Sequence, residues 1–257
     1  MRTAAHTWFM VGRQARNLFR EPIWIALMLI QPMVWLLLYG QLFKRLPALG
    51  GFGTDSYIEF LTPGIVVMNA FFGGTWSGMA MISDLDRKIV ERFLATPVSR
   101  ISLVLSQVVR AGLTACIQSL ILLVAGFVLG ARIDAGAIGW LVILAAAALV
   151  AATFAGISHG IALLVRKEAT MIATANFIGL PLFFLSTALI ARSAMPEWIR
   201  WAARFNPLEW GVVAAREVTL AGAAWSSVAG HLGLLVAAAA VTAGFATWTF
   251  RAYQRTL

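Results

Sequence analysis

The sequence predicts an all-α integral membrane protein with six transmembrane helices, an N-terminal interfacial helix, a short cytoplasmic helix and a re-entrant helical pair before the last span. Of the 257 residues, 60% are hydrophobic and only 12% are charged, so no soluble core could bury all the apolar surface. Six charge-free runs reach the ~20 residues that a helix needs to cross a bilayer. Basic residues flank these runs, so anionic lipid headgroups explain the net charge of +9 better than nucleic acid does.

The first 21 residues predict an interfacial helix rather than a signal peptide. No short apolar core with a small-residue cleavage site follows the first arginine. Over residues 4–20, three arginines spaced i, i+3 and i+7 lie opposite an apolar face: Arg13, Arg16 and Arg20 against Trp8, Val11, Ala15, Leu18 and Phe19. Such a helix lies in the membrane interface, and Pro22 marks the turn into the bilayer. Contact with a cytoplasmic partner is the alternative.

The six expected spans follow from the charge-free runs, which are 22–43, 60–83, 111–131, 135–165, 169–191 and 218–250. We expect the third run to belong to a longer helix that starts near Ile101 and includes Arg110, and the last span to cover about 226–250. Prolines predict kinks in spans 1, 2 and 5, at Pro32, Pro63 and Pro181. Small residues at four-residue spacing predict close helix packing, at Ala70, Gly74 and Gly78 and at Ala152, Gly156 and Gly160.

The distribution of basic residues predicts that both termini are cytoplasmic. Six spans place the two termini on one side of the membrane. That side carries 12 basic residues, in the N-terminal segment, the loops after spans 2 and 4, and the tail, whereas the other side carries 7. Because cytoplasmic loops carry the excess of lysine and arginine, the side with 12 is assigned to the cytoplasm.

Residues 84–100 form a charged, amphipathic segment between two apolar runs. Ser83 is a candidate N-cap with Asp86 three residues on, and Pro97 ends the predicted helix. One face is apolar, with Leu85, Ile89, Val90, Phe93 and Leu94, and the rest is charged, with Asp84, Arg87, Lys88, Glu91 and Arg92. Two interpretations stay open: an interfacial helix lying on headgroups, or a coupling helix that transmits force from a partner protein.

The segment 192–217 is too charged to span a membrane and too aromatic for a solvated loop. It contains tryptophans 198, 201 and 210 and prolines 196 and 207. This pattern predicts two short helices, broken at Asn206–Pro207, that dip into the outer interface. The same residues also satisfy an ordinary aromatic belt.

Several kinds of chemistry are absent from the sequence. No acidic residue lies in the middle of a predicted span, which argues against an ion-driven carrier. His159 and His231 fit packed, hydrogen-bonded histidines better than a proton relay. Three scattered histidines and the single Cys116 give no metal-ligand cluster and no disulfide. None of the three lysines follows a glycine, so the chain has no Walker A motif and any ATPase must be another polypeptide.

Taken together, these features resemble the ABC-2 type ABC transporter permeases over essentially the whole chain. The resemblance is carried by the six spans, the N-terminal amphipathic helix, the Thr96-Pro97-Val98-Ser99-Arg100 run, and Asn206-Pro207-Leu208 with Arg216 downstream. The chain looks most like the daunorubicin-resistance subgroup of drug-efflux permeases. One departure is Ile89, where members often carry glycine, so the start of the coupling helix is left open.

The resemblance implies a half-transporter in a bacterial inner membrane. Two permease chains, identical or different, would pair, and each would dock on a separate ABC ATPase subunit that binds ATP and Mg, with no cofactor on this chain. The ATPase-coupling residues would be Asp84, Leu85, Asp86, Arg87, Glu91, Arg92, Phe93, Leu94 and Pro97. Spans 1, 2 and 5 would line the substrate path, with Gln31, Asn69 and Asn176 as its polar contacts. Each of these three could equally form hydrogen bonds within the bundle.

The expected function is outward transport of an amphipathic or hydrophobic small molecule or lipid, with an outer gate at Trp198, Asn206 and Pro207. We expect a single ABC-2 type domain over 1–257, divided into 1–21, 22–83, 84–100, 101–191, 192–217 and 218–257. The alternatives are a permease that exports a lipid-linked glycan and, from a different class, a non-transporting membrane scaffold. The chain itself is not expected to be an enzyme or to bind nucleic acid.

Overall fold

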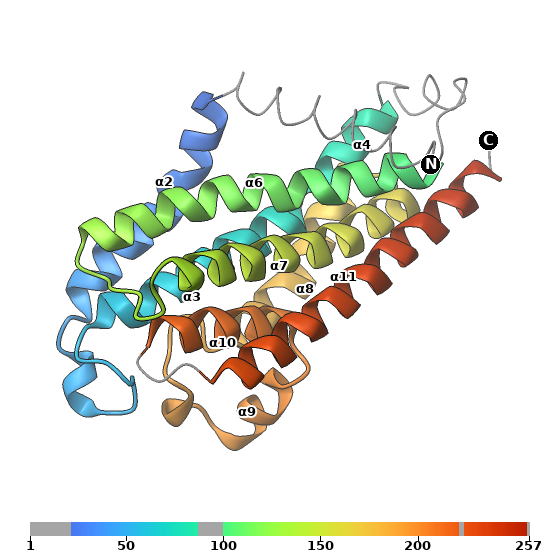
Figure 1. Cartoon of the computed structure of the whole chain (residues 1–257). Coiled ribbons are helices and arrows are strands. Elements are labelled where there is room, and N and C mark those ends of the chain that lie inside the picture. Colours follow the sequence, from blue (N-terminus) through green and yellow to red (C-terminus); the bar gives the residue numbers. More distant parts are fainter. Residues whose placement is uncertain (1–21, 87–99, 221–223, 256–257) are drawn as a thin grey trace.

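The computed structural model describes residues 22–86, 100–220 and 224–255, and within these ranges all regular secondary structure is helical (Figure 1), which confirms the all-α class. The helices are α2 (Pro22–Leu42), η1 (Leu46–Leu49), α3 (Tyr57–Trp76), α4 (Gly78–Asp86), α6 (Arg100–Val128), α7 (Gly136–Val165), α8 (Glu168–Phe184), η2 (Arg192–Ala194), α9 (Glu197–Ala203), α10 (Pro207–Thr219) and α11 (Trp225–Gln254). Several predictions lie outside the described residues: the interfacial helix over 4–20, and Arg87, Glu91, Arg92, Phe93, Leu94 and Pro97 of the coupling helix.

Four helical segments are long and apolar enough to cross a membrane: Tyr57–Asp86, Leu105–Val128, Gly136–Val165 and Trp225–Gln254. Two shorter apolar helices accompany them, Ala26–Leu42 and Glu168–Phe184. A helix of 17 residues is about 25 Å long, somewhat less than the ~30 Å hydrocarbon core. The chain is therefore a multi-pass membrane protein, and the six-span arrangement stays a prediction.

Helix α7 lies at the centre of the bundle and packs against α3, α6, α10 and α11. The predicted small-residue positions make these approaches possible. A Cβ added at Gly74 would lie 2.5 Å from the carbonyl oxygen of Ala151 on α7, and one added at Gly156 would lie 2.6 Å from Thr242 Oγ1 on α11. The close packing predicted for these glycines is therefore confirmed.

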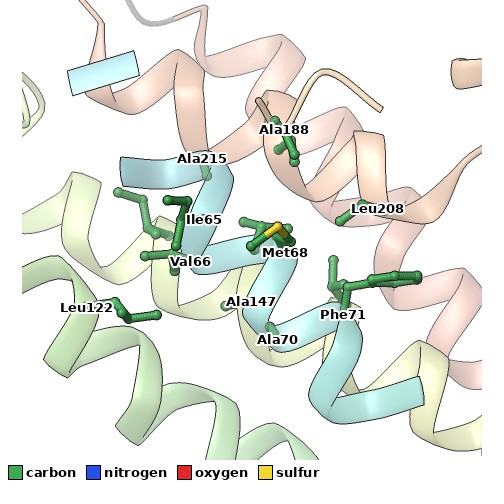
Figure 2. Close-up of a cluster of buried hydrophobic side chains, with 14 of the residues drawn as sticks. Ile65, Val66, Met68, Ala70, Phe71, Leu122, Ala147, Ala188, Leu208 and Ala215 are labelled. Atoms are coloured by element: carbon green, nitrogen blue, oxygen red, sulfur yellow. The ribbon is translucent and has the colours of Figure 1, made fainter. Parts of the chain in front are cut away.

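The main hydrophobic core surrounds α3, whose side chains pack against other elements on two opposite sides of the helix. Figure 2 shows Leu122 of α6 on one side of α3, and Leu208 of α10 with Ala188 on the other. Phe71 is completely buried and packs edge-on against Phe154 of α7, with ring centroids 4.5 Å apart. Because it is packed on both sides, α3 forms the rigid axis of this part of the protein.

The second expected span, 60–83, is broken where the sequence did not predict it. Helix α3 continues past Pro63 and ends at Trp76, and α4 begins at Gly78. Ser77 lies between them, where its backbone N–H and its hydroxyl both bind the carbonyl of Gly74. The prediction of Ser83 as an N-cap was wrong, because α4 runs without interruption through Ser83 to Asp86. The segment from Asp84 to Asp86 therefore continues the second span.

The fifth expected span, 169–191, also ends early, because α8 stops at Phe184 and residues 185–191 contain no helix. Other boundaries agree with the sequence. Helix α6 starts at Arg100 and includes Arg110, α11 covers the expected last span, and α9 and α10 flank Asn206. Figure 1 shows α4 and the C-terminal end of α11 at one end of the bundle, with α9 and α10 at the other.

Candidate functional site

Asn206 binds the ends of two helices at once. Its Nδ2 donates to the carbonyl oxygens of Leu182 and Leu185, at 2.7 and 2.9 Å, where α8 ends. Its Oδ1 accepts from the backbone N–H of Leu208 at 3.0 Å, as an N-cap of α10, and Pro207 occupies the first helical position. Asn206 thereby satisfies carbonyls that the last turn of α8 would otherwise leave without partners.

Glu209 and Arg216 bind the same residue, Thr187, in the non-helical linker 185–191. Glu209 Oε2 accepts from the backbone N–H of Thr187 at 2.7 Å and from its hydroxyl at 2.9 Å. Arg216 Nη1 donates to that hydroxyl at 3.1 Å, and Nη2 donates to the Thr187 and Ala188 carbonyls at 2.9 and 3.3 Å. We call this set, with Asn206, the Thr187 junction.

Of the two charged residues of the Thr187 junction, Glu209 is buried and Arg216 is half-buried. Glu209 is only 3% exposed, and the Arg216 guanidinium carbon lies 3.7 Å from the centroid of the Phe60 ring. Glu209 and Arg216 are seven residues apart, so they lie on one face of α10. An arginine remains charged at neutral pH, and its position against an aromatic face and three carbonyls stabilises that charge.

A second polar cluster lies at the break between α3 and α4. The Ser158 hydroxyl of α7 donates to the carbonyl of Thr75 at 2.6 Å and accepts from the N–H of Gly78 at 2.9 Å. His159 is 2% exposed, and its Nδ1 lies 3.3 Å from the Ser77 hydroxyl oxygen. We call this set the Ser77 junction. It satisfies the backbone of the broken span with side chains from a neighbouring helix, as membrane proteins require.

The histidines lie in hydrogen-bonded surroundings, in line with the packed-histidine interpretation. His159 contacts Ser77 as described, and His231 Nδ1 lies 2.8 Å from the carbonyl oxygen of Ser227 in its own helix. His159 Nε2 is buried and has no hydrogen-bond partner among the residues that the structure describes. The geometry places His159 beside the break between α3 and α4.

The three predicted path residues lie on three helices. Asn69 of α3 donates through Nδ2 to Oε1 of the buried Gln118 on α6, at 3.0 Å. Asn176 is exposed on α8 and donates to the carbonyl of Ile172 in its own helix, at 3.1 Å. Gln31 is exposed on α2. The structure thus ties Asn69 into the bundle and leaves Gln31 and Asn176 on outward-facing surfaces.

The three predicted gate residues separate into two groups. Asn206 and Pro207 belong to the Thr187 junction, whereas Trp198 is 66% exposed on α9. Trp201 of α9 and Phe205, which follows the helix, are 64% and 67% exposed, and their ring centroids lie 5.2 Å apart. This exposed aromatic face has the composition of an interfacial belt.

Sequence reasoning missed Glu209, Thr187 and Ser158. A signal existed for Glu209, because Asn206 with Glu209 three residues later has the spacing of a capping box. In the structure the carboxylate binds Thr187 instead of the Asn206 backbone. Thr187 and Ser158 carried no signal, because single hydroxyls inside apolar runs usually bind their own helix.

Comparison with known proteins agrees with this architecture. Residues 5–220 match the family described as ABC-2 type transporter. A transport permease named ycf38 from Cyanophora paradoxa is 31% identical over 206 residues, which cover 79% of this chain and 70% of the relative. The daunorubicin resistance ABC transporter permease protein DrrB1 of Streptomyces coeruleorubidus is 23% identical over 256 residues, which cover 98% and 86%. The doxorubicin resistance permease DrrC of Mycobacterium tuberculosis is 23% identical over 178 residues, which cover 69% and 64%.

In this family the permeases are transmembrane subunits, and ATPase activity lies on separate subunits. Four of the described helical segments are long and apolar enough to cross a membrane, which agrees with a transmembrane subunit. The chain belongs to the ABC-2 type transporter family, as a membrane permease subunit that works with an ABC ATPase subunit.

Proposed function

We propose that this permease exports an amphipathic or hydrophobic small molecule or lipid, driven by ATP and Mg bound on its ATPase partner. The observation that carries the proposal is that α4 continues the second span through Asp84, Leu85 and Asp86, the first three of the predicted coupling residues. A push on residues 84–97 would therefore act on a helix that is part of the transmembrane bundle. The relatives named for daunorubicin and doxorubicin resistance support an amphipathic substrate.

The Ser77 junction supports a route for that push. Helix α4 packs against α7 and α8, and Ser158 joins its first residue to the last turn of α3. Leu85 is half-buried near the end of α4. We infer that closure of the ATPase dimer displaces α4 and that the break at Ser77 lets α4 turn without unwinding α3.

A second permease copy, identical or different, would complete the path. Helices α2 and α8 each expose large apolar side chains, among them Ile23, at 75%, and Phe177, at 82%, and each also exposes a polar one, Gln31 or Asn176. An exposed amide is costly against hydrocarbon. We infer that these faces meet a partner permease and the substrate path rather than lipid alone.

The proposed setting is a bacterial inner membrane with both termini in the cytoplasm. The basic residues support this orientation, and α9 and α10 then lie at the outer end, opposite α4 (Figure 1). Export of a lipid-linked glycan is the alternative substrate assignment. The chain has only three tyrosines and no aromatic track of the kind that binds sugars, so we rank the glycan second.

Purification from the native host in a mild detergent tests the proposal. We expect an ABC ATPase subunit to co-purify at one copy per permease. Replacing Phe93 and Leu94 together by aspartate should abolish this association while the protein still inserts into the membrane. A matched control introduces two aspartates at exposed positions on the opposite side, Ala48 and Ala194, and should leave the association unchanged. Retained association in the Phe93/Leu94 variant would overturn the coupling assignment.

A further inference from the structure

We propose that Glu209 and Arg216 close the outer exit of the transport path by holding Thr187, and that the exit opens when these bonds are exchanged. The proposal rests on the export function proposed above. Both side chains would be positioning residues, because they act on the linker 185–191 and not on the transported molecule.

The linker is held mainly by side chains of other elements, in addition to its own Ser186 hydroxyl, which donates to the Phe183 carbonyl at 2.7 Å. The carbonyl of Leu185 accepts a hydrogen bond from Asn206, and that of Ala188 accepts one from Arg216. Thr187 forms hydrogen bonds with both Glu209 and Arg216. The carbonyl of Leu189 accepts from the Tyr57 hydroxyl of α3 at 3.1 Å. None of these bonds belongs to a helix ladder. The linker can therefore leave its position without the unfolding of any helix, which a switching element requires.

The linker also fits tightly against α3. Ala188 is completely buried, and Figure 2 shows it beside α3, on the same side as Leu208 of α10. A Cβ added at Gly64 of α3 would overlap the backbone carbonyl of Ala188. Because α3 leaves no space behind the linker, we expect the linker to move away from α3 when it moves. That direction would separate the outer end of α8 from the rest of the bundle.

Two polar atoms of the junction are buried and unused. Glu209 Oε1 and Arg216 Nε have no hydrogen-bond partner among the residues that the structure describes. Buried polar groups in a permanent anchor are normally satisfied. Glu209 Oε1 can accept a hydrogen bond and Arg216 Nε can donate one. These two atoms could therefore form new hydrogen bonds in an open state, once Thr187 has left.

The Thr187 hydroxyl connects the two charged residues, because it donates to Glu209 and accepts from Arg216. Thr187→Val removes this hydroxyl at almost constant volume, and Thr187→Ser keeps it. Thr219→Val is the matched control. Thr219 is 3% exposed on α10, and among the described residues its hydroxyl bonds only to the carbonyl of Ala215 in its own helix, at 2.8 Å.

The test measures labelling of Ser186→Cys, in a Cys116→Ala background, by a membrane-impermeant maleimide added outside sealed vesicles. Ser186 is 5% exposed, so labelling should be slow. Thr187→Val should raise the rate about tenfold, the effect expected when interhelical hydrogen bonds are lost in a bilayer. Thr187→Ser and Thr219→Val should keep the rate close to that of the starting protein. Equal rates in the Thr187→Val and Thr219→Val proteins would overturn the proposal.

A second measurement separates opening of the exit from general loosening. In protein that keeps the native Cys116 and lacks the new cysteine, Thr187→Val should leave labelling of Cys116 unchanged. Faster labelling at both sites would mean that the whole bundle loosens, and would also overturn the proposal. At Glu209, Gln keeps an acceptor oxygen and should label slowly, whereas Leu should label quickly. Equal fast rates for both would show that the charge of Glu209, not its bond to Thr187, holds the linker, and would overturn the proposal.

Addition of the ATPase partner distinguishes this proposal from the proposed function. With the partner and ATP, labelling of Ser186→Cys should rise in protein with native Thr187. If the Thr187→Val effect is present but ATP changes nothing, the junction closes no exit of an ATP-driven path and the gate assignment is overturned. The co-purification test with the Phe93 and Leu94 variant does not depend on this result. The two experiments can therefore overturn the coupling assignment and the gate assignment separately.

Discussion

Replacing Ser158 by alanine is expected to destabilise the protein by about 2 kcal/mol. The Ser158 side chain is 3% exposed, and its hydroxyl bridges the Thr75 carbonyl and the Gly78 N–H at 2.6 and 2.9 Å. Alanine removes both bonds and leaves the Gly78 N–H buried without a partner, which costs about 1–3 kcal/mol. Each interhelical hydrogen bond in a bilayer contributes about 0.6 kcal/mol on average and up to about 1.7 kcal/mol, so the loss of two bonds agrees with a figure near 2 kcal/mol.

Thr153→Val is the matched control for this substitution. Thr153 lies on the same helix and is completely buried, and within the described part of the chain its hydroxyl donates only to the carbonyl of Leu149 one turn earlier, at 2.8 Å. That carbonyl also accepts within the helix ladder, so valine should leave no backbone group unsatisfied. We expect a loss below about 0.5 kcal/mol.

Both variants are measured by reversible unfolding in mixed micelles of sodium dodecyl sulfate and a mild detergent, followed by tryptophan fluorescence. The difference between the two unfolding free energies isolates the contribution of the bridge across the helix break. If Ser158→Ala and Thr153→Val agree within about 0.5 kcal/mol, the bridge contributes nothing beyond an ordinary hydroxyl. That result would refute the account of the Ser77 junction.

Four further substitutions are measured in the same assay. Gly64→Ala should lower the free energy of unfolding by about 1–3 kcal/mol, because the new Cβ overlaps the Ala188 carbonyl. Gly179→Ala is the control and should leave it unchanged, because the nearest atom to the new Cβ is 3.6 Å away. Equal effects of the two substitutions would contradict the close fit of Ala188 against α3. Asn206→Ala should cost about 2 kcal/mol by removing a cap and two carbonyl bonds, and a loss below about 0.5 kcal/mol would show that water replaces them. Trp198→Ala, at a 66% exposed side chain, should change stability by less than about 0.5 kcal/mol, and a larger loss would mean that α9 packs against protein.

The sequence was sufficient for most helices because apolar runs and turn residues are local signals. The break at Asn206 was predictable, since an N-cap residue followed by proline favours a helix start. The end of α8 was not. Residues 169–191 are free of charge, and the Pro181 within them predicts a kink rather than a helix end. Most groups that bind the linker lie more than 20 residues further along the chain, as for Thr187 and Glu209. Periodicity within a short window contains no such information.

The same limit applies to the candidate site residues. Asn69 was recognisable as a polar residue in an apolar run, but its partner Gln118 lies 49 residues away. Glu209 belongs to a segment that was classified as outer surface because of its charges, and only the three-dimensional packing of α10 against α3, α7 and α11 buries it. A charged residue in such a segment can be identified as buried only when the packing of its helix is known.

The two junctions lie at opposite ends of α3, which connects them mechanically. The Ser77 junction holds one end, and Tyr57, Phe60 and Gly64 contact the Thr187 junction or its linker at the other. Most of α3 is buried, so it should move as a rigid body rather than bend. In the complex with ATPase and ATP, Ser158→Ala should therefore abolish the ATP-dependent rise in labelling of Ser186→Cys, while labelling without ATP stays slow. An unchanged rise would show that the movement reaches the outer end by a route other than α3.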